Sequence, residues 1–230
     1  MTAPYVLVGV DGSAVAVRAL DRAADEAARR RTALRLVYAV PDRDEAAPVL
    51  ASARTRLRAR HPGLPVAATA AEGGAVRALV RESAGASLTV VGAGGLGAVA
   101  GALFGSVSLR LAARPPGPLL VVRGARTRDE GCAVLLGLES DAEADAAAYA
   151  FAEAERRGAR LRVFPNSRTA TWAGRPDPVR ALLAATREAS VAVVGAHRRT
   201  HRFGPPLGQV AHALLHHSHC PVLVVPAPPV

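Results

Sequence analysis

The residues best suited to bind a charged ligand are glycines and serines in the middle of the chain. The segment GAGG, residues 92–95, is followed nine residues later by Gly105-Ser106, which gives the pattern G-x2-G-x9-G-S. Glycines let backbone N–H groups approach an anion, and a helix that begins near Ser106 adds N–H donors at the positive end of its dipole. The pattern favours a polyphosphate cradle without the lysine of a P-loop. From the residues alone, a packing role for the glycines and an N-cap role for Ser106 stay open.

Two other interpretations of the same region fail on context. From Ser83 to Leu109 the chain carries no charge, as in a membrane helix, but each of its glycines would cost such a helix about 1 kcal/mol. Gly92, Gly94 and Gly97 also spell GxGxxG, the dinucleotide fingerprint. That motif belongs after a first strand, with an acid about 20 residues further on, and neither condition holds here. The sequence therefore predicts neither a membrane span nor a dinucleotide site.

The chain contains two copies of an internal repeat. TVVGAG at residues 89–94 recurs as AVVGAH at 192–197, and VLVGVDGS at residues 6–13 is echoed by VLLGLESD at 134–141. Such a repeat is long enough to form a compact domain. We expect a first domain at 1–124, a linker at 125–131 and a second domain at 132–230. The second copy is shorter, with its loss opposite residues 41–71.

Apolar runs and amphipathic segments alternate within the first copy. Val-rich runs bounded by Gly, Pro or Asp predict buried strands, and the segments between them predict helices. This alternation is typical of a doubly wound parallel α/β sheet. Strands are expected at 5–10, 34–40, 66–73, 87–94 and 118–124, and helices at 14–31, 45–60, 74–84 and 106–113.

Composition narrows the class of partner. The hydrophobic fraction of 50% is sufficient for a core, and with 3% aromatic residues that core must consist of Ala, Val and Leu. The net charge of +10 comes entirely from arginine and favours anionic partners, although biased codon usage would also produce it. Scattered arginines and few aromatics disfavour nucleic acid. The unpaired Cys132 and Cys220, with no secretory signal, predict a cytoplasmic protein.

The combined motifs resemble the universal stress protein family. G-x2-G-x9-G-S after a VVG strand, VGVDGS at the first strand and P-x-LVV at the last are together more specific than any one glycine motif. The resemblance covers the whole chain as two tandem family units. It implies two tandem open parallel five-stranded sheets of order 3-2-1-4-5 with helices on both faces, a Rossmann-like arrangement. One branch of the family binds ATP at the carboxyl ends of the strands.

The resemblance also implies which residues of the first copy bind ATP. Asp11 matches the acid near the ribose and phosphates, where Mg²⁺ would neutralise the phosphates, although Asp11 could instead cap the next helix. Ala39 matches the position whose backbone faces adenine. Ser108 could be a phosphate ligand or simply a polar residue of the first helical turn. The complete expected set is Gly9, Val10, Asp11, Ala39, Val91, Gly92, Gly95, Gly105, Ser106, Val107 and Ser108.

The second copy departs from this pattern. Arg198 stands in place of the second glycine, and Gly208 is followed by Gln209 where the first copy has a serine. Glu139 matches Asp11, and Pro165 matches Ala39. We therefore expect one competent nucleotide site per chain, in the first copy.

Other catalytic or metal-binding patterns are weak. His212 and His216 lie one helical turn apart with Cys220 nearby, a spacing that permits zinc, but complementing the dipole at the end of a helix accounts for them better. A general base between Asp11 and Ser106 is missing from the pattern, so at most slow ATP hydrolysis or self-phosphorylation is expected.

These features predict a nucleotide-responsive regulator of stress or dormancy that binds ATP and Mg²⁺ in its N-terminal domain and acts on an unknown protein partner. The alternative is a dimerisation scaffold with a relict glycine loop. The last strands, PLLVV and PVLVV, are edge segments that would pair within the chain or between two chains.

Overall fold

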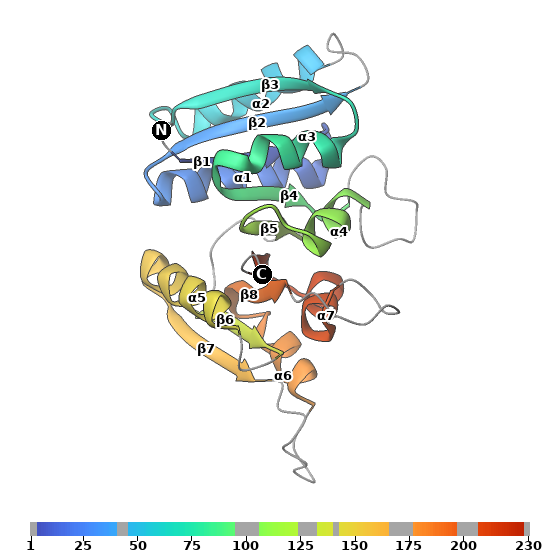
Figure 1. Cartoon of the computed structure of the whole chain (residues 1–230). Coiled ribbons are helices and arrows are strands. Elements are labelled where there is room, and N and C mark those ends of the chain that lie inside the picture. Colours follow the sequence, from blue (N-terminus) through green and yellow to red (C-terminus); the bar gives the residue numbers. More distant parts are fainter. Residues whose placement is uncertain are drawn as a thin grey trace. The chain divides into compact units, whose positions relative to one another are not determined.

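The computed structural model describes residues 4–40, 46–94, 106–123, 133–139, 143–165, 177–196 and 207–227 (Figure 1). The chain divides into two compact units. Unit 1 comprises Met1–Leu111 with Pro115–Thr127, and unit 2 comprises Ala112–Arg114 with Arg128–Val230. No helix in the described ranges has the length and apolarity needed to cross a membrane.

Unit 1 has the predicted five-stranded parallel sheet. Its strands lie in the order β3-β2-β1-β4-β5, which is the order 3-2-1-4-5 expected from the family. Each apolar run of the sequence forms a strand, and each amphipathic segment forms a helix. The strands are β1 (Tyr5–Gly9), β2 (Ala33–Val40), β3 (Val66–Glu72), β4 (Ala86–Gly92) and β5 (Leu119–Val122). The helices are α1 (Ala14–Arg29), α2 (Ala46–Arg60), α3 (Ala75–Glu82) and α4 (Ser106–Ala113), with a 3-10 turn at Ser83–Gly85.

Glycines at the strand ends let helices approach both faces of this sheet. A Cβ on Gly92 would lie 3.0–3.1 Å from atoms of Val15 in α1, and a Cβ on Gly9 would lie 3.2 Å from Leu79 in α3. Right-handed crossovers place α1 and α2 on one face and α3 on the other. The buried stripe of α1 is mostly alanine, which keeps that helix close to the strands.

Tyr5, the first residue of β1, is held by two other elements. Its side chain is buried, and its hydroxyl donates a hydrogen bond of 2.5 Å to the carbonyl of Glu82. The guanidinium of Arg35 lies 4.0 Å above the centre of the ring, a cation–π contact. Tyr5 therefore fastens the beginning of β1 to β2 and to the end of α3.

The part of unit 2 that the structure describes has the same architecture with one strand fewer. Its described strands lie in the order β9-β8-β6-β7, all parallel, so the prediction of five strands in each half is wrong for this half. Only residues 166–177 separate β7 from α6, whereas residues 41–74, which include one helix and one strand, separate β2 from α3 in unit 1. The strands are β6 (Ala133–Leu138), β7 (Arg160–Pro165), β8 (Ala189–Ala196) and β9 (Val222–Pro226), and the helices are α5 (Ala144–Arg157), α6 (Pro178–Ala185) and α7 (Gln209–His217).

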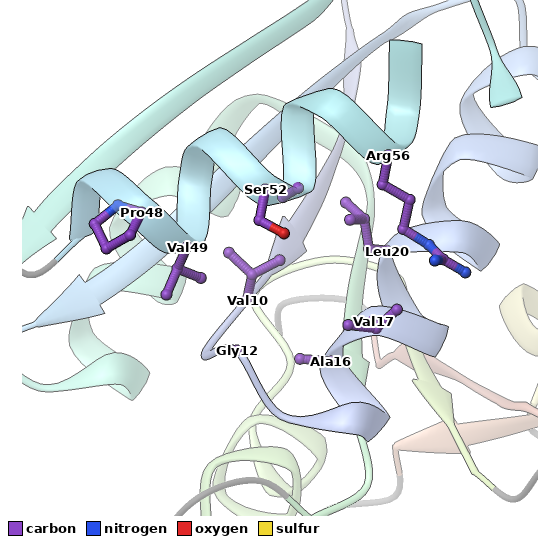
Figure 2. Close-up of a pocket in the computed structure, with 10 residues that line it drawn as sticks. Val10, Gly12, Ala16, Val17, Leu20, Pro48, Val49, Ser52 and Arg56 are labelled. Atoms are coloured by element: carbon purple, nitrogen blue, oxygen red, sulfur yellow. The ribbon is translucent and has the colours of Figure 1, made fainter. Parts of the chain in front are cut away.

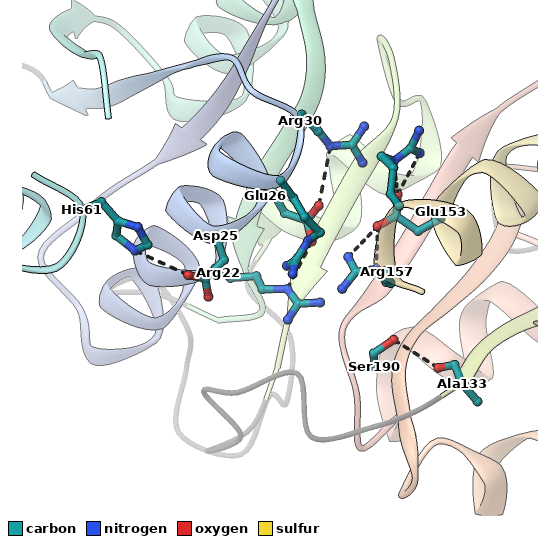
Figure 3. A network of polar contacts seen from close by, with 11 residues as sticks. Arg22, Asp25, Glu26, Arg30, His61, Ala133, Glu153, Arg157 and Ser190 are labelled. Carbon is teal, nitrogen blue, oxygen red and sulfur yellow. Dashed lines mark hydrogen bonds and ion pairs between the residues drawn. The ribbon is translucent and has the colours of Figure 1, made fainter. Parts of the chain in front are cut away.

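Each unit buries a glutamate among arginines near the end of its first helix (Figure 3). Glu26 of α1 lies 3.5 Å from the Nε atoms of Arg22 and of Arg30. Glu153 of α5 lies 2.5 Å from Nη2 of Arg157, and both of these side chains are almost fully buried. Buried carboxylates of this kind need such partners, because an unpaired buried charge is costly.

Candidate nucleotide site at the strand ends of unit 1

The carboxyl ends of three neighbouring strands meet at one edge of unit 1. In the parallel register, Gly9 of β1 lies beside Val37 of β2, and Val8 lies beside Val90 of β4. The N–H of Val10 donates a hydrogen bond of 2.9 Å to the carbonyl of Val37, which extends this pairing past the end of β1. The expected site residues Gly9, Val10, Asp11, Ala39, Val91 and Gly92 therefore all come to this edge.

A tight turn fixes Asp11 between β1 and α1. The N–H of Ser13 donates to Oδ1 of Asp11 at 3.0 Å, and Gly12 has φ of +79°, a conformation that favours glycine. The hydroxyl of Ser13 accepts from the N–H of Ala16 at 3.2 Å, so Ser13 is the N-cap of α1. Asp11 thus remains a partly exposed carboxylate at the edge of the sheet.

The second arm of the expected cradle begins at β4 and ends at α4. β4 ends at Gly92, two residues before the predicted end of this strand, and α4 begins at Ser106, as predicted. Gly95 and Gly105 lie outside the described residues, and of Ser106 only its backbone position at the start of α4 is described. Val107 is partly exposed, whereas Ser108 is buried with 1% of its surface exposed. Ser108 therefore has little access to a ligand.

A cavity opens between α1 and α2 beside the Asp11 turn (Figure 2). It has a volume of about 300 Å³, and its walls are mostly apolar. Val10 and Gly12 form the end nearest the turn, Ser52 contributes a hydroxyl, and Arg56 stands at the far end. The sequence alone did not predict this cavity, because its walls come together only where α1 and α2 pack against each other.

Asp21 holds Arg56 in place at the far end of the cavity. Nε and Nη2 of Arg56 each donate to an oxygen of Asp21 at 2.7 Å, a bidentate pair, and Arg60 adds a third contact at 3.3 Å. These hydrogen bonds raise the pKa of Arg56. The positive charge of Arg56 is therefore already compensated, and the cavity itself suits an uncharged, flat, apolar group.

Arg123 brings a positive charge to the same edge of the sheet. It directly follows Val122, the last residue of β5, which lies beside Gly92 of β4. The N–H of Ala93 donates to the carbonyl of Val122 at 2.8 Å, so the first residue after β4 stays beside the end of β5. Partial burial lowers the pKa of Arg123, and an anion nearby would favour its charged form. The expected site lacked this residue, although the sequence PLLVVRG places it directly after the last strand.

Unit 2 fills the corresponding position with its own carboxylate. Glu139 follows β6 as Asp11 follows β1, but Oε1 of Glu139 accepts a hydrogen bond of 2.5 Å from the N–H of Val210 in the first turn of α7. A Cβ on Gly208, the N-cap of α7, would clash with both oxygens of Glu139. The anion position at the start of α7 is thus taken by Glu139.

The described histidines of unit 2 lie on α7 and just after it. The rings of His212 and His216 lie 4.3 Å apart between centroids, on α7. Cys220 is buried, and its N–H donates to the hydroxyl of Ser218 at 3.2 Å. Among the described residues, no group of three or more His, Cys, Asp or Glu side chains could hold a metal ion.

The sheet order and the convergence of strand ends place unit 1 in the class of open, doubly wound, Rossmann-like α/β proteins. The sequence model described as the universal stress protein family matches residues 5–58, 42–123 and 162–226. These matches cover most of both halves, and the protein belongs to this family. The resemblance seen in the sequence motifs is confirmed.

Relatives of the chain carry the same family name. Universal stress protein Rv2028c of Mycobacterium tuberculosis is 32% identical over 177 residues, which is 70% of this chain and 63% of that protein. The chain thus aligns with less than two thirds of that relative. A universal stress protein of Mycolicibacterium smegmatis is 29% identical over 96% of both chains.

Two solved structures show the same fold. A protein described as functionally unknown, PA1789 of Pseudomonas aeruginosa, has a TM-score of 0.72 at 20% identity, over 96% of this chain and 92% of its own. A universal stress protein of Archaeoglobus fulgidus has a TM-score of 0.70 at 16% identity, over 98% of this chain and 99% of its own.

Proposed function

We propose that unit 1 binds ATP with Mg²⁺ at the carboxyl edge of its sheet, and that the chain is a nucleotide-responsive regulator of stress or dormancy. The observation that carries this proposal is the convergence of the Asp11 turn with the ends of β2 and β4 at the point where the strand order reverses. In open α/β sheets, ligands bind in this crevice.

The cavity between α1 and α2 supports a place for the nucleobase. A volume of about 300 Å³ with mostly apolar walls suits a flat aromatic ring, and the cavity begins at Val10 and Gly12, next to Asp11. Ser52 would supply a polar contact to the edge of the base. Ala39, whose backbone is expected to face adenine, lies in the neighbouring strand β2, one residue before its last residue, Val40.

The phosphates would lie between Asp11 and the start of α4. Magnesium is held in proteins by one or two carboxylates together with phosphate oxygens, and Asp11 supplies one such carboxylate. Backbone N–H groups at the start of α4 and the guanidinium of Arg123 would bind the phosphate oxygens. Binding would fix the segment from Gly92 to Gly105, which then presents an altered surface to a partner.

One nucleotide per chain is proposed, because Glu139 already occupies the anion position of unit 2. The N–H of Val210 that a phosphate would need is bonded to Glu139 at 2.5 Å. A phosphate would have to displace this carboxylate and would meet its negative charge. Efficient catalysis is not part of the proposal, since the pattern around Asp11 and Ser106 offers no general base.

Thermal unfolding with and without ATP and Mg²⁺ tests the proposal. A ligand at about 100 times its Kd stabilises the folded state by about 2.7 kcal/mol, so the melting temperature of the wild type should rise. Gly105→Val should abolish this rise by blocking close approach of the phosphates. Gly63→Val is the matched control, because a Cβ on Gly63 meets no atom within 4 Å. No shift in the wild type at saturating nucleotide would refute ATP binding and favour the dimerisation scaffold.

A further inference from the structure

β3 presents a regular open edge in unit 1. In the described part of the chain it pairs with β2 alone, in an unbroken register from Val66 beside Leu34 to Glu72 beside Val40. Proteins usually protect an edge strand with lysines, prolines, bulges or a covering element. The sequence VAATAAE has none of these residues, and only its last residue is charged. The outer side of β3 therefore offers a row of backbone donors and acceptors with small side chains.

A hollow lined by basic side chains lies at the start of this edge. It has a volume of about 150 Å³. Its walls are formed by the basic residues Arg54, Arg58 and His61 and by the apolar residues Pro62, Leu64 and Val66. Arg54, Arg58 and His61 follow one another at intervals of four and three residues, so they share one face at the end of α2. Val66, the first residue of β3, joins the hollow to the strand edge.

The arginines of α2 differ in how their charges are compensated. Arg56 and Arg60 face α1 and contact Asp21 at 2.7 and 3.3 Å. Arg54 and Arg58 are exposed, and within the described residues neither has an acidic partner. The hollow therefore combines two uncompensated guanidinium groups with the protein's net charge of +10, which attracts anionic partners.

We propose that the β3 edge and this hollow form a docking site for an extended acidic segment of a partner protein. The segment adds a strand to β3 through main-chain hydrogen bonds, and its carboxylates bind Arg54 and Arg58. Carboxylates on alternate residues of a strand are about 6.6 Å apart, close to the rise of about 6 Å between Arg54 and Arg58 along α2. The preferred motif is therefore acid-x-acid.

The edge and the hollow together favour a peptide over a free anion. A phosphate ion would fill the hollow but leave the backbone groups of β3 unpaired. An acidic strand satisfies both features, and the small side chains Ala67 and Thr69 leave room for a neighbouring strand. Because the site lies at the amino-terminal end of β3, away from the carboxyl edge, it does not depend on nucleotide binding.

Fluorescence polarisation with a short labelled peptide, in which glutamate alternates with valine, tests this proposal on the full chain. Arg54→Ala/Arg58→Ala should weaken binding by about tenfold or more, and added salt should weaken it further. Arg77→Ala/Arg180→Ala removes the same charge from exposed positions elsewhere and should leave the affinity within about twofold of the wild type. A peptide with glutamine in place of glutamate should not bind.

Hydrogen–deuterium exchange supplies the second readout. Bound peptide should slow exchange of the β3 amides, because those that point away from β2 gain partners. Equal loss of affinity in the two double variants would overturn the proposal. Peptide binding that leaves the β3 amides unprotected would also overturn the proposal. If inorganic phosphate then competes fully with the peptide, the hollow is a simple anion site.

Discussion

Asp11 and Glu139 follow the first strand of their units, and one methylene group decides what each carboxylate reaches. Asp11 accepts a hydrogen bond from Ser13, two residues further along its own turn. Glu139 extends to the first turn of α7 and accepts from Val210. The longer side chain therefore fills the anion position of unit 2, whereas the shorter one is bonded within its own turn in unit 1.

Replacing Glu139 should destabilise unit 2. Glu139→Ala removes the carboxylate that caps α7, and the loss of an N-terminal cap typically costs about 1 kcal/mol. We expect a lower melting temperature of the full chain. Glu155→Ala, which removes an exposed acid from α5, is the control and should have little effect. Equal melting temperatures for the two variants would show that the Glu139 contact contributes nothing.

The glycine at the end of β4 should tolerate no side chain. In Gly92→Ala the new Cβ would lie 3.0 Å from Cγ2 and 3.1 Å from the backbone oxygen of Val15, so α1 would have to move. We expect a loss of about 1–3 kcal/mol, the usual cost of overpacking, measured as a lower denaturation midpoint. Gly63→Ala, where a Cβ meets nothing within 4 Å, should be close to neutral. A neutral Gly92→Ala would mean that α1 is not in close contact with β4.

Arg123 should contribute to nucleotide affinity. Arg123→Ala removes the positive charge that follows β5 beside Gly92, and calorimetric titration with ATP and Mg²⁺ should show binding weakened by about tenfold or more. Adenosine, which has no phosphates, should bind the variant and the wild type alike. Equal weakening for ATP and adenosine would assign Arg123 to packing instead.

At the scale of elements, the contact between α1 and α2 shapes the cavity. Asp21→Asn would remove the charge that holds Arg56 at 2.7 Å and Arg60 at 3.3 Å. Charge-assisted hydrogen bonds contribute about 1.5–3 kcal/mol, and the partial exposure of both arginines favours the lower end of that range. We expect a lower melting temperature than for Glu188→Asn, which changes an exposed acid. No difference between the two variants would refute a stabilising role for this pair.

The element pattern of unit 1 could be predicted from the sequence because its signals are local. Buried parallel strands appear as Val-rich runs, and Gly, Pro and Asp mark their ends. The predicted starts of α1 and α4, Ala14 and Ser106, agree with the structure. The cavity and the position of Arg123 could not be predicted, because they depend on which strands and helices become neighbours in space.

At the scale of the whole molecule, the shortened second copy explains the wrong strand count. The repeat shows that residues opposite 41–71 are missing, yet the family resemblance favours five strands in both halves. Residues 166–177 stand where unit 1 has the much longer segment 41–74, and the described part of unit 2 has four strands. The local deletion outweighs the family pattern, because a strand needs about five residues of its own.

Only one of the two units should bind nucleotide. Calorimetric titration of the wild type with ATP and Mg²⁺ should give one equivalent of nucleotide per chain, because Glu139 occupies the anion position of unit 2. Asp11→Ala should weaken this single site, because the carboxylate at the edge is lost. Two equivalent sites in the wild type would contradict the proposed role of Glu139.

The contacts of Tyr5 give unit 1 its own optical signal. Tyr5 is fixed by Glu82 and by the guanidinium above its ring. In this asymmetric environment the ring of Tyr5 absorbs left and right circularly polarised near-ultraviolet light unequally. Because Tyr149 of unit 2 lies near Arg156 and absorbs in the same band, the signal of Tyr5 is isolated as the difference in near-ultraviolet dichroism between the wild type and Tyr5→Phe. Recorded during heating, this difference follows the melting of unit 1 without any added label.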